Sequence, residues 1–274
     1  MSPFQAFILG AVQGATEFLP ISSSGHLVLV PWLLGWELEP SAAFIFDVLV
    51  QWGTLLAVII YFFKDLVKIA AAVVRGILEG KPFSEPMARL GWLLLAASLP
   101  AAMLGVLAKS TVESAFANPR LVSLFLLATA AILAISERIG DQLRAMDEIN
   151  LPDALIIGLA QSLALFPGIS RSGATIAGGL IRDLKRPDAA RFSFLMSVPI
   201  MIGAGGIALL DLSGAPGALE QLPALLIGFG TAALVGYLAI RWLLAYLAAH
   251  RLNIFIYYCT AIGLGGFLLS VIQN

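Results

Sequence analysis

Charge is what this sequence has least of: 12% of its 274 residues are Asp, Glu, Lys or Arg, whereas 59% are hydrophobic. A soluble domain carries roughly twice that share of charge, so the composition excludes a water-soluble globular protein. Cys259 is the single cysteine and excludes an internal disulfide. The net charge of −1 carries no message about nucleic acid, and no nucleic-acid partner is expected.

What the sequence does have is long apolar runs. Segments of alternating hydrophobicity are missing, so the spans are expected to be helical. Two apolar segments, 4–35 and 152–182, are interrupted by Pro, Gly and Ser, and each piece is too short to cross a bilayer. We therefore predict an all-α polytopic membrane protein with six transmembrane helices and two re-entrant helical hairpins. The predicted transmembrane helices are 42–63, 88–108, 119–137, 190–210, 222–247 and 253–272.

The distribution of basic residues predicts the orientation. With the loop 64–89 inside, thirteen of the 16 basic residues collect on the inner side. Lys109 and Arg120 lie outside, and Arg171 lies in the second hairpin. This is the positive-inside pattern. It places both termini outside, with the first hairpin entering from the outer face and the second from the inner face.

The two broken segments are related to each other. Residues 10–25 (GAVQGATEFLPISSSG) and 158–173 (GLAQSLALFPGISRSG) align without gaps, with seven identities in sixteen pairs. Halves that enter from opposite faces form an inverted-topology repeat, and binding sites in such folds lie near the midplane. We predict a single membrane domain over 1–274, with a first repeat over 1–137 and a second over 150–274. The alternative is a duplicated packing motif without function.

The two breaks contain residues that are costly in a membrane. Glu17 lies in the first break and Arg171 in the second, and charges at such depth need partners and mark function. Ser and Gly precede a second half-helix in each hairpin, expected to begin near His26 and Ala174. A Ser-capped helix N-terminus binds anions, and Gly25 and Gly173 allow close approach of a ligand. Together with Arg171, this predicts a pocket for a phosphorylated ligand.

Three residues of the first break offer chemistry. Ser23 and His26 are three positions apart at a helix start and can form an activated-nucleophile pair, with Glu17 orienting the imidazole. Glu17 can instead hold a divalent metal, or serve only as the counter-ion of Arg171. The serines can act as helix caps alone, and His26 can be an interface residue. Asp47 and Gln51 either line the pocket or face the outer interface.

The residues of the two breaks form two motifs that resemble those of the undecaprenyl-diphosphate phosphatase family, also called bacitracin-resistance proteins. The first is Gln13-Gly14-Ala15-Thr16-Glu17 followed by FLPISSSGH, and the second is PGISRSGAT, residues 167–175. The resemblance covers essentially the whole chain. It implies a phosphatase that removes the terminal phosphate of the C55 lipid diphosphate on the outer face of the bacterial cytoplasmic membrane, recycling the cell-wall carrier and conferring bacitracin resistance.

The resemblance also assigns roles to individual residues. The positions matching the catalytic core are Glu17, Ser23, His26 and Arg171. The expected phosphate-binding group comprises Gln13, Ser22, Ser24, Gly25, Ser170, Ser172, Gly173 and Thr175. A divalent cation, Mg²⁺ or Ca²⁺, is implied, with Glu17 as its tentative ligand. Many members have Glu where this chain has Gln13, and a Gln cannot bind metal as a carboxylate.

The expected partners are the polyprenyl diphosphate substrate and membrane lipids, and a homodimer is left open. The rival function is a transporter or flippase for phosphate or polyprenyl phosphate, because paired broken helices in inverted repeats are typical of transporters.

Overall fold

The computed structural model describes residues 1–107, 118–212 and 222–273. Within these ranges the backbone is helical apart from turns and one isolated bridge between Arg144 and Leu184. The last residue of the predicted span 88–108 and Lys109 lie outside the described ranges. The helices are α1 (Pro3–Phe18), α2 (Ser23–Leu33), α3 (Pro40–Tyr61), α4 (Phe63–Leu78), α5 (Pro86–Leu107), α7 (Pro119–Ser136), η1 (Met146–Glu148), α8 (Leu151–Leu163), α9 (Arg171–Ile181), α10 (Arg186–Leu212), α11 (Leu222–Leu247) and α12 (Asn253–Ile272).

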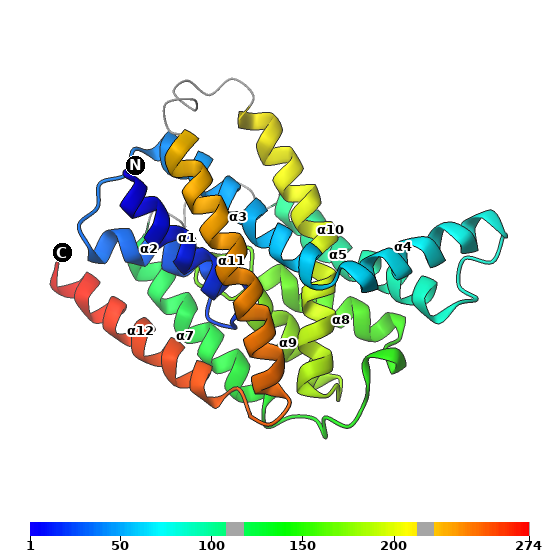
Figure 1. Cartoon of the computed structure of the whole chain (residues 1–274). Helices are drawn as coiled ribbons and strands as arrows, with labels where there is room; N and C mark the ends of the chain where they lie inside the picture. The colour runs from blue at the N-terminus through cyan, green and yellow to red at the C-terminus, as the bar shows by residue number, and fades with distance from the viewer. Residues whose placement is uncertain (108–117, 213–221, 274) are drawn as a thin grey trace.

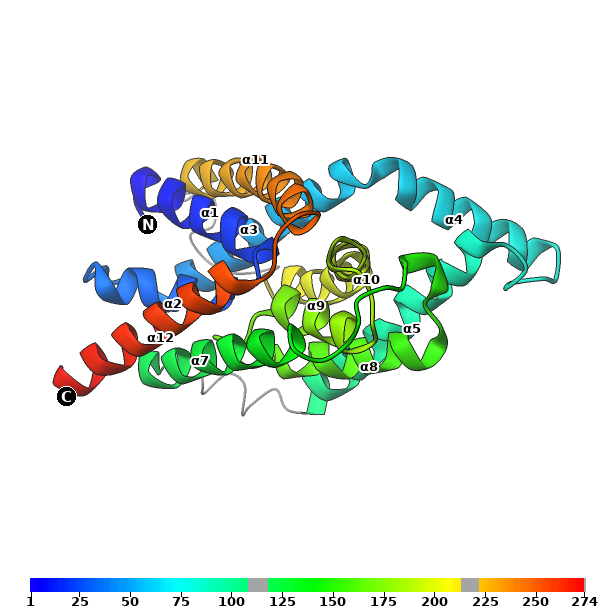
Figure 2. The same cartoon turned by 90° about the horizontal axis from the view of Figure 1, so that it is seen from below.

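Among the described residues, six helices are long and apolar enough to cross a membrane, which confirms the predicted number of spans. They are Ala42–Tyr61, Pro86–Gly105, Pro119–Ser136, Arg186–Gly206, Leu222–Leu247 and Asn253–Ile272. Figure 1 shows both termini at one end of the bundle, with α4 projecting from the other end, and the turned view in Figure 2 agrees.

The predicted loop 64–89 contains a helix that the sequence interpretation did not include. α4 is 16 residues long and packs against α5, where Ile69 and Val73 approach Gly91. Its opposite side exposes apolar residues such as Val74. Lys64, Asp65, Lys68 and Arg75 interrupt the apolar run that a membrane span needs, so the sequence interpretation treats the segment as a connection. The apolar residues between these charges nevertheless recur with a helical period.

Two pairs of short helices occupy the segments predicted to be broken. α1 and α2 are separated by residues 19–22, and α8 and α9 by residues 164–170. α1 packs along α11, whereas α8 packs along α5, so each pair is held mainly by a long helix from the other half of the chain. α7 and α12 pack on each other, and α7 also contacts α2 and α9. This packing brings the two breaks together.

Candidate functional site

Both breaks end in the same serine cap. The Ser22 hydroxyl accepts a hydrogen bond from the Gly25 amide at 3.2 Å, and the Ser170 hydroxyl accepts one from the Gly173 amide at 3.0 Å. The predicted Ser caps are therefore present. α2 and α9 begin at Ser23 and Arg171, three residues earlier than expected. Each helix thus starts on the residue that bears the predicted chemistry.

The two breaks are in direct contact. The Ser172 hydroxyl donates to the Leu19 carbonyl oxygen at 3.1 Å. A Cβ on Gly25 would lie 3.1 Å from the Gly168 Cα, so the backbones approach as closely as a glycine allows. The N-termini of α2 and α9 consequently lie close together. Since each N-terminus carries a partial positive charge, the junction favours an anion.

Glu17 is the centre of the polar contacts at this junction. Its Oε1 forms an ion pair with Arg171 Nη2 from the other break. Its Oε2 accepts hydrogen bonds from the Ser23 hydroxyl at 2.5 Å and from Gln13 Nε2 at 3.1 Å. The Glu17 side chain is 5% exposed and the Arg171 side chain is 22% exposed, so the ion pair is largely buried. Because Ser23 donates directly to a carboxylate, its hydroxyl proton has an acceptor in place.

A cavity of about 230 Å³ opens at this junction. It is lined by Glu17, Ser22, Ser23, Ser24, Gln51, Ala164, Ile169, Ser170, Arg171, Ile200, Met201 and Ala204. The cavity joins the charged and hydroxyl groups of both breaks to an apolar wall from α10. Gln51, whose position the sequence left open, lies in the lining.

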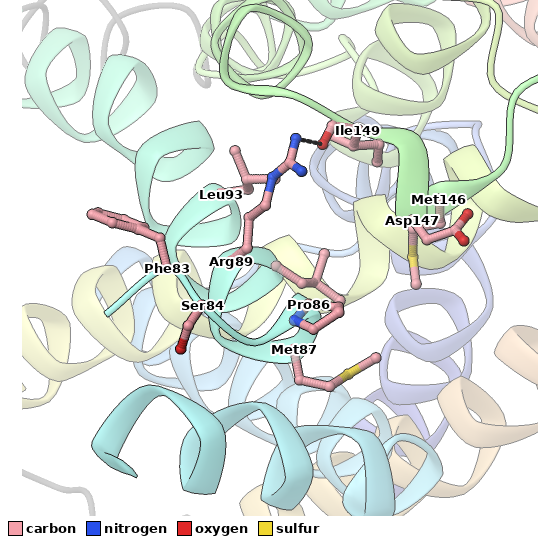
Figure 3. Close-up of a pocket in the computed structure, with 10 residues that line it drawn as sticks. Phe83, Ser84, Pro86, Met87, Arg89, Leu93, Met146, Asp147 and Ile149 are labelled. Carbon is pink, nitrogen blue, oxygen red and sulfur yellow. Dashed lines mark hydrogen bonds between the residues drawn. The ribbon is translucent and has the colours of Figure 1, made fainter. Parts of the chain in front are cut away.

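A larger cavity of about 310 Å³ lies between α5 and η1. Figure 3 shows its walls, where Arg89 donates to the Ile149 carbonyl oxygen at 3.2 Å and Asp147 lies at one side. None of the motif residues lines it. Size alone therefore does not locate the site, whereas the convergence of both breaks does.

His26 is placed differently from our expectation. Its Nδ1 lies 2.7 Å from the Ser22 carbonyl oxygen, and its Nε2 lies 2.8 Å from the Tyr258 hydroxyl. Ser23 pairs with Glu17 instead of the imidazole. The spacing of Ser23 and His26 allowed them to meet, but the carbonyl of the capping residue is the nearer partner. Tyr258, 232 residues away in sequence, gave no signal that sequence reasoning could use.

Several of the other predicted phosphate-binding residues form hydrogen bonds with protein groups and do not line the cavity. The Thr175 hydroxyl donates to the Arg171 carbonyl oxygen at 2.8 Å and lies 2.6 Å from the Ser193 hydroxyl. The Ser170 and Ser172 hydroxyls form a hydrogen bond with each other at 3.2 Å. Gln13, Gly25, His26, Ser172, Gly173 and Thr175 do not line the cavity. Their contacts shape the backbone that does.

The residues present do not complete a cation site. Among the described residues no group of three or more His, Cys, Asp or Glu side chains lies together. Glu17 is the one carboxylate in the cavity lining, and both of its oxygens already have partners in Arg171 and Ser23. Hard divalent cations take six or more oxygen ligands, which this donor set does not supply.

The comparisons with known proteins agree with the two motifs. The family profile described as "Bacitracin resistance protein BacA" matches residues 6–265. The chain belongs to this family. A relative from Chlorobium phaeovibrioides, named "Undecaprenyl-diphosphatase", is 45% identical over 269 residues, covering 94% of this chain and 93% of the relative. A relative of the same name from Desulforudis audaxviator is 39% identical over 274 residues, covering the whole of both chains. The resemblance inferred from residues 13–26 and 167–175 is thereby confirmed.

Proposed function

We propose that this protein is a membrane phosphatase that hydrolyses undecaprenyl diphosphate to undecaprenyl phosphate and inorganic phosphate. The observation that carries the proposal is the contact of Glu17 with both Ser23 and Arg171 where two helix N-termini meet. A carboxylate, a hydroxyl and a guanidinium in one polar cavity can bind a diphosphate and attack it. Membership of a family whose curated relatives carry that name supports the substrate.

The diphosphate binds with its terminal phosphate against Arg171 and the N-termini of α2 and α9. Arg171 then exchanges its contact with Glu17 for the phosphate oxygens, which frees the carboxylate to accept a proton. The Ser23 Oγ attacks the terminal phosphorus while its proton passes to Glu17. The bond from that phosphorus to the bridging oxygen breaks, and the lipid monophosphate leaves with the electron pair. Water then attacks the phosphorus of the phosphoserine and the bond from phosphorus to Ser23 Oγ breaks. Inorganic phosphate leaves, and Glu17 returns the proton to Ser23 Oγ.

The charge carried by Arg171 persists throughout these steps. A guanidinium matches two phosphate oxygens at once through parallel N–H groups. Phosphoryl transfer depends mainly on positioning and on stabilising negative charge, which an arginine and two helix N-termini supply. The apolar α10 wall, with Ile200 and Met201, accommodates the first part of a prenyl chain whose remainder stays in the bilayer.

The architecture that presents this site is proposed to be an inverted repeat. In support, α1–α2 and α8–α9 have matching serine caps and matching packing on a long helix from the other half. Both pairs are proposed to be re-entrant hairpins, within repeats 1–137 and 150–274 of one domain. The excess of basic residues on one side supports a site that faces the outside of the cytoplasmic membrane. Recycling of the cell-wall carrier there accounts for bacitracin resistance.

A divalent cation remains a proposal from the family resemblance. Glu17 is the one carboxylate of the cavity lining that would hold it, and no step above depends on the ion. When bound, such an ion adds positive charge to that of Arg171. Activity after chelation, followed by addition of Mg²⁺ or Ca²⁺, tests this requirement.

The experiment compares two arginines that line different cavities. Purified protein in detergent is given undecaprenyl diphosphate, and released phosphate is measured for wild type, Arg171→Ala and Arg89→Ala. We expect hydrolysis by wild type and Arg89→Ala and loss of hydrolysis in Arg171→Ala. Wild type without phosphate release, or an active Arg171→Ala, contradicts the proposal. Flux of lipid phosphate in sealed vesicles that survives Arg171→Ala would favour the transporter instead.

A further inference from the structure

Each break contains one residue in the left-handed backbone region, and each such residue is held by its carbonyl oxygen. Ser22 has φ +70° and Gly168 has φ +103°. The Ser22 oxygen accepts from His26 Nδ1 at 2.7 Å as well as from the His26 amide at 3.2 Å. The Gly168 oxygen accepts from the Thr129 hydroxyl at 2.9 Å. Glycine adopts a positive φ freely, whereas serine does so at a cost in free energy. The conformation of Ser22 therefore depends more on its hydrogen bonds than that of Gly168 does.

The contacts of His26 fix the proton on its ring. A carbonyl oxygen can only accept, so Nδ1 carries the hydrogen that reaches Ser22. In the neutral ring Nε2 is then an acceptor, and the Tyr258 hydroxyl donates to it at 2.8 Å. The two rings are stacked, with centroids 5.6 Å apart and planes 16° apart. Both nitrogens are therefore engaged away from Ser23, which donates to Glu17.

Helix α12 supports this break at a second point. Cys259, the neighbour of Tyr258, donates from Sγ to the Pro20 carbonyl oxygen at 3.7 Å. α7 supports the other break in the same manner, because the Ser170 amide donates to the Thr129 hydroxyl at 3.0 Å. Each break is thus held to one long helix by hydrogen bonds to side chains of that helix.

We propose that His26 and Tyr258 are positioning residues: Tyr258 holds the imidazole, and the imidazole holds Ser22 in its left-handed conformation so that Ser23 faces the cavity. This rests on the proposed function of Ser23. It assigns the acceptance of the Ser23 proton to Glu17 and leaves His26 with no proton to transfer.

Substitutions at His26 separate positioning from base catalysis. The side-chain nitrogen of Asn occupies the place of Nδ1 and can still donate to Ser22, but Asn cannot accept a proton as a base. We expect His26→Asn to keep kcat within about tenfold of wild type, as for one altered hydrogen bond. His26→Ala should lose roughly 100-fold, as a misplaced reacting group does. His26→Gln, whose nitrogen matches Nε2 instead, should resemble His26→Ala.

The pH dependence of kcat should be the same in His26→Asn as in wild type. A folded His26→Asn protein that is no more active than His26→Gln, or that loses a limb of the pH profile, overturns the proposal. Folding is checked by thermal unfolding in detergent. The Asn and Gln comparison holds even where His26→Ala fails to fold.

Tyr258 has a matched control in its neighbour Tyr257, whose side chain is 71% exposed against 38% for Tyr258. Tyr258→Phe should lower kcat by roughly two- to tenfold with KM unchanged, as expected for one neutral hydrogen bond. Tyr257→Phe should leave both unchanged. Equal kcat values in the two variants contradict the positioning role.

A spectroscopic measurement tests the inference without any turnover. The chain has two histidines, so ¹⁵N NMR of labelled protein, assigned with His250→Gln, reports the His26 tautomer directly. We expect the neutral form protonated at Nδ1, with the Nε2 signal shifted in Tyr258→Phe. A ring protonated at Nε2 alone refutes the inference even if the protein hydrolyses lipid diphosphate, whereas an inactive wild type with the expected tautomer refutes only the proposed function.

Discussion

Replacing Glu17 by Gln removes the negative charge while keeping the size of the side chain. The amide oxygen can still accept from Ser23 or Arg171, so the packing at the junction persists. What disappears is the group that accepts the Ser23 proton. Loss of a general base lowers kcat by roughly 10²- to 10⁴-fold. The stability cost should be smaller, about 1–3 kcal/mol, since it reflects hydrogen bonds to a charged group.

Glu137 provides a control with the same chemistry and the same burial. Its carboxylate pairs with Arg186 at 2.5 Å, and the exposed fractions of carboxylate and guanidinium are 5% and 22%, identical to those of Glu17 and Arg171. Glu137→Gln should therefore destabilise the protein to a similar degree and leave kcat within a few-fold of wild type. The assays are phosphate release at saturating substrate and thermal unfolding followed by tryptophan fluorescence.

The comparison has two outcomes that refute the reasoning. One is Glu17→Gln with the kcat of wild type, which shows that the carboxylate is only a counter-ion. The other is an equal loss of kcat in Glu137→Gln, which shows that any buried Glu–Arg pair affects activity through stability.

Three further perturbations are expected to have distinct effects. Arg171→Lys keeps the charge but loses the bidentate contact with phosphate. It should lower kcat/KM by roughly 10- to 100-fold, since hydrogen bonds to charged groups contribute about 1.5–3 kcal/mol. An unchanged kcat/KM refutes this expectation. Gly168→Ala places a Cβ 2.4 Å from a carbonyl oxygen of α7 at φ +103°, and should destabilise the protein by about 1–3 kcal/mol in thermal unfolding, whereas Gly203→Ala, with open space around it, should not. Burial raises the pKa of Glu137, but hydrogen bonds and the charge of Arg186 lower that pKa by more than burial raises it, so the net shift is downward from 4.5. Its stabilisation is full above that value and is lost as the pH falls through the lower folded pKa, so the melting temperature of wild type should fall more steeply in acid than that of Glu137→Gln.

The breaks could be predicted from sequence because their signals are local. Pro, Gly and Ser inside apolar runs end helices wherever they fall, and a charge such as Glu17 or Arg171 at membrane depth needs a partner. The alignment of the two breaks then indicated that these two charges belong together. Their ion pair joins residues 154 positions apart.

The contacts of individual side chains could not be predicted in the same way. Ser23 and His26 have a spacing that allows contact, but the choice of partner depends on rotamers and on the left-handed backbone at Ser22. Tyr258 and Thr129 lie on distant helices with nothing in their local sequence to mark them. Such contacts follow from the packing of whole helices, which no short motif encodes.

The most direct measurement follows the terminal phosphate of undecaprenyl diphosphate labelled with ³²P at that position. Wild-type protein is mixed with the lipid, quenched in acid after different times and analysed for inorganic phosphate and for label on the chain. We predict label on Ser23 that appears before inorganic phosphate and then decays, and neither product with Ser23→Ala. Inorganic phosphate released by Ser23→Ala at the rate of wild type, or no release by wild type, would contradict a phosphatase built on Ser23 and Glu17.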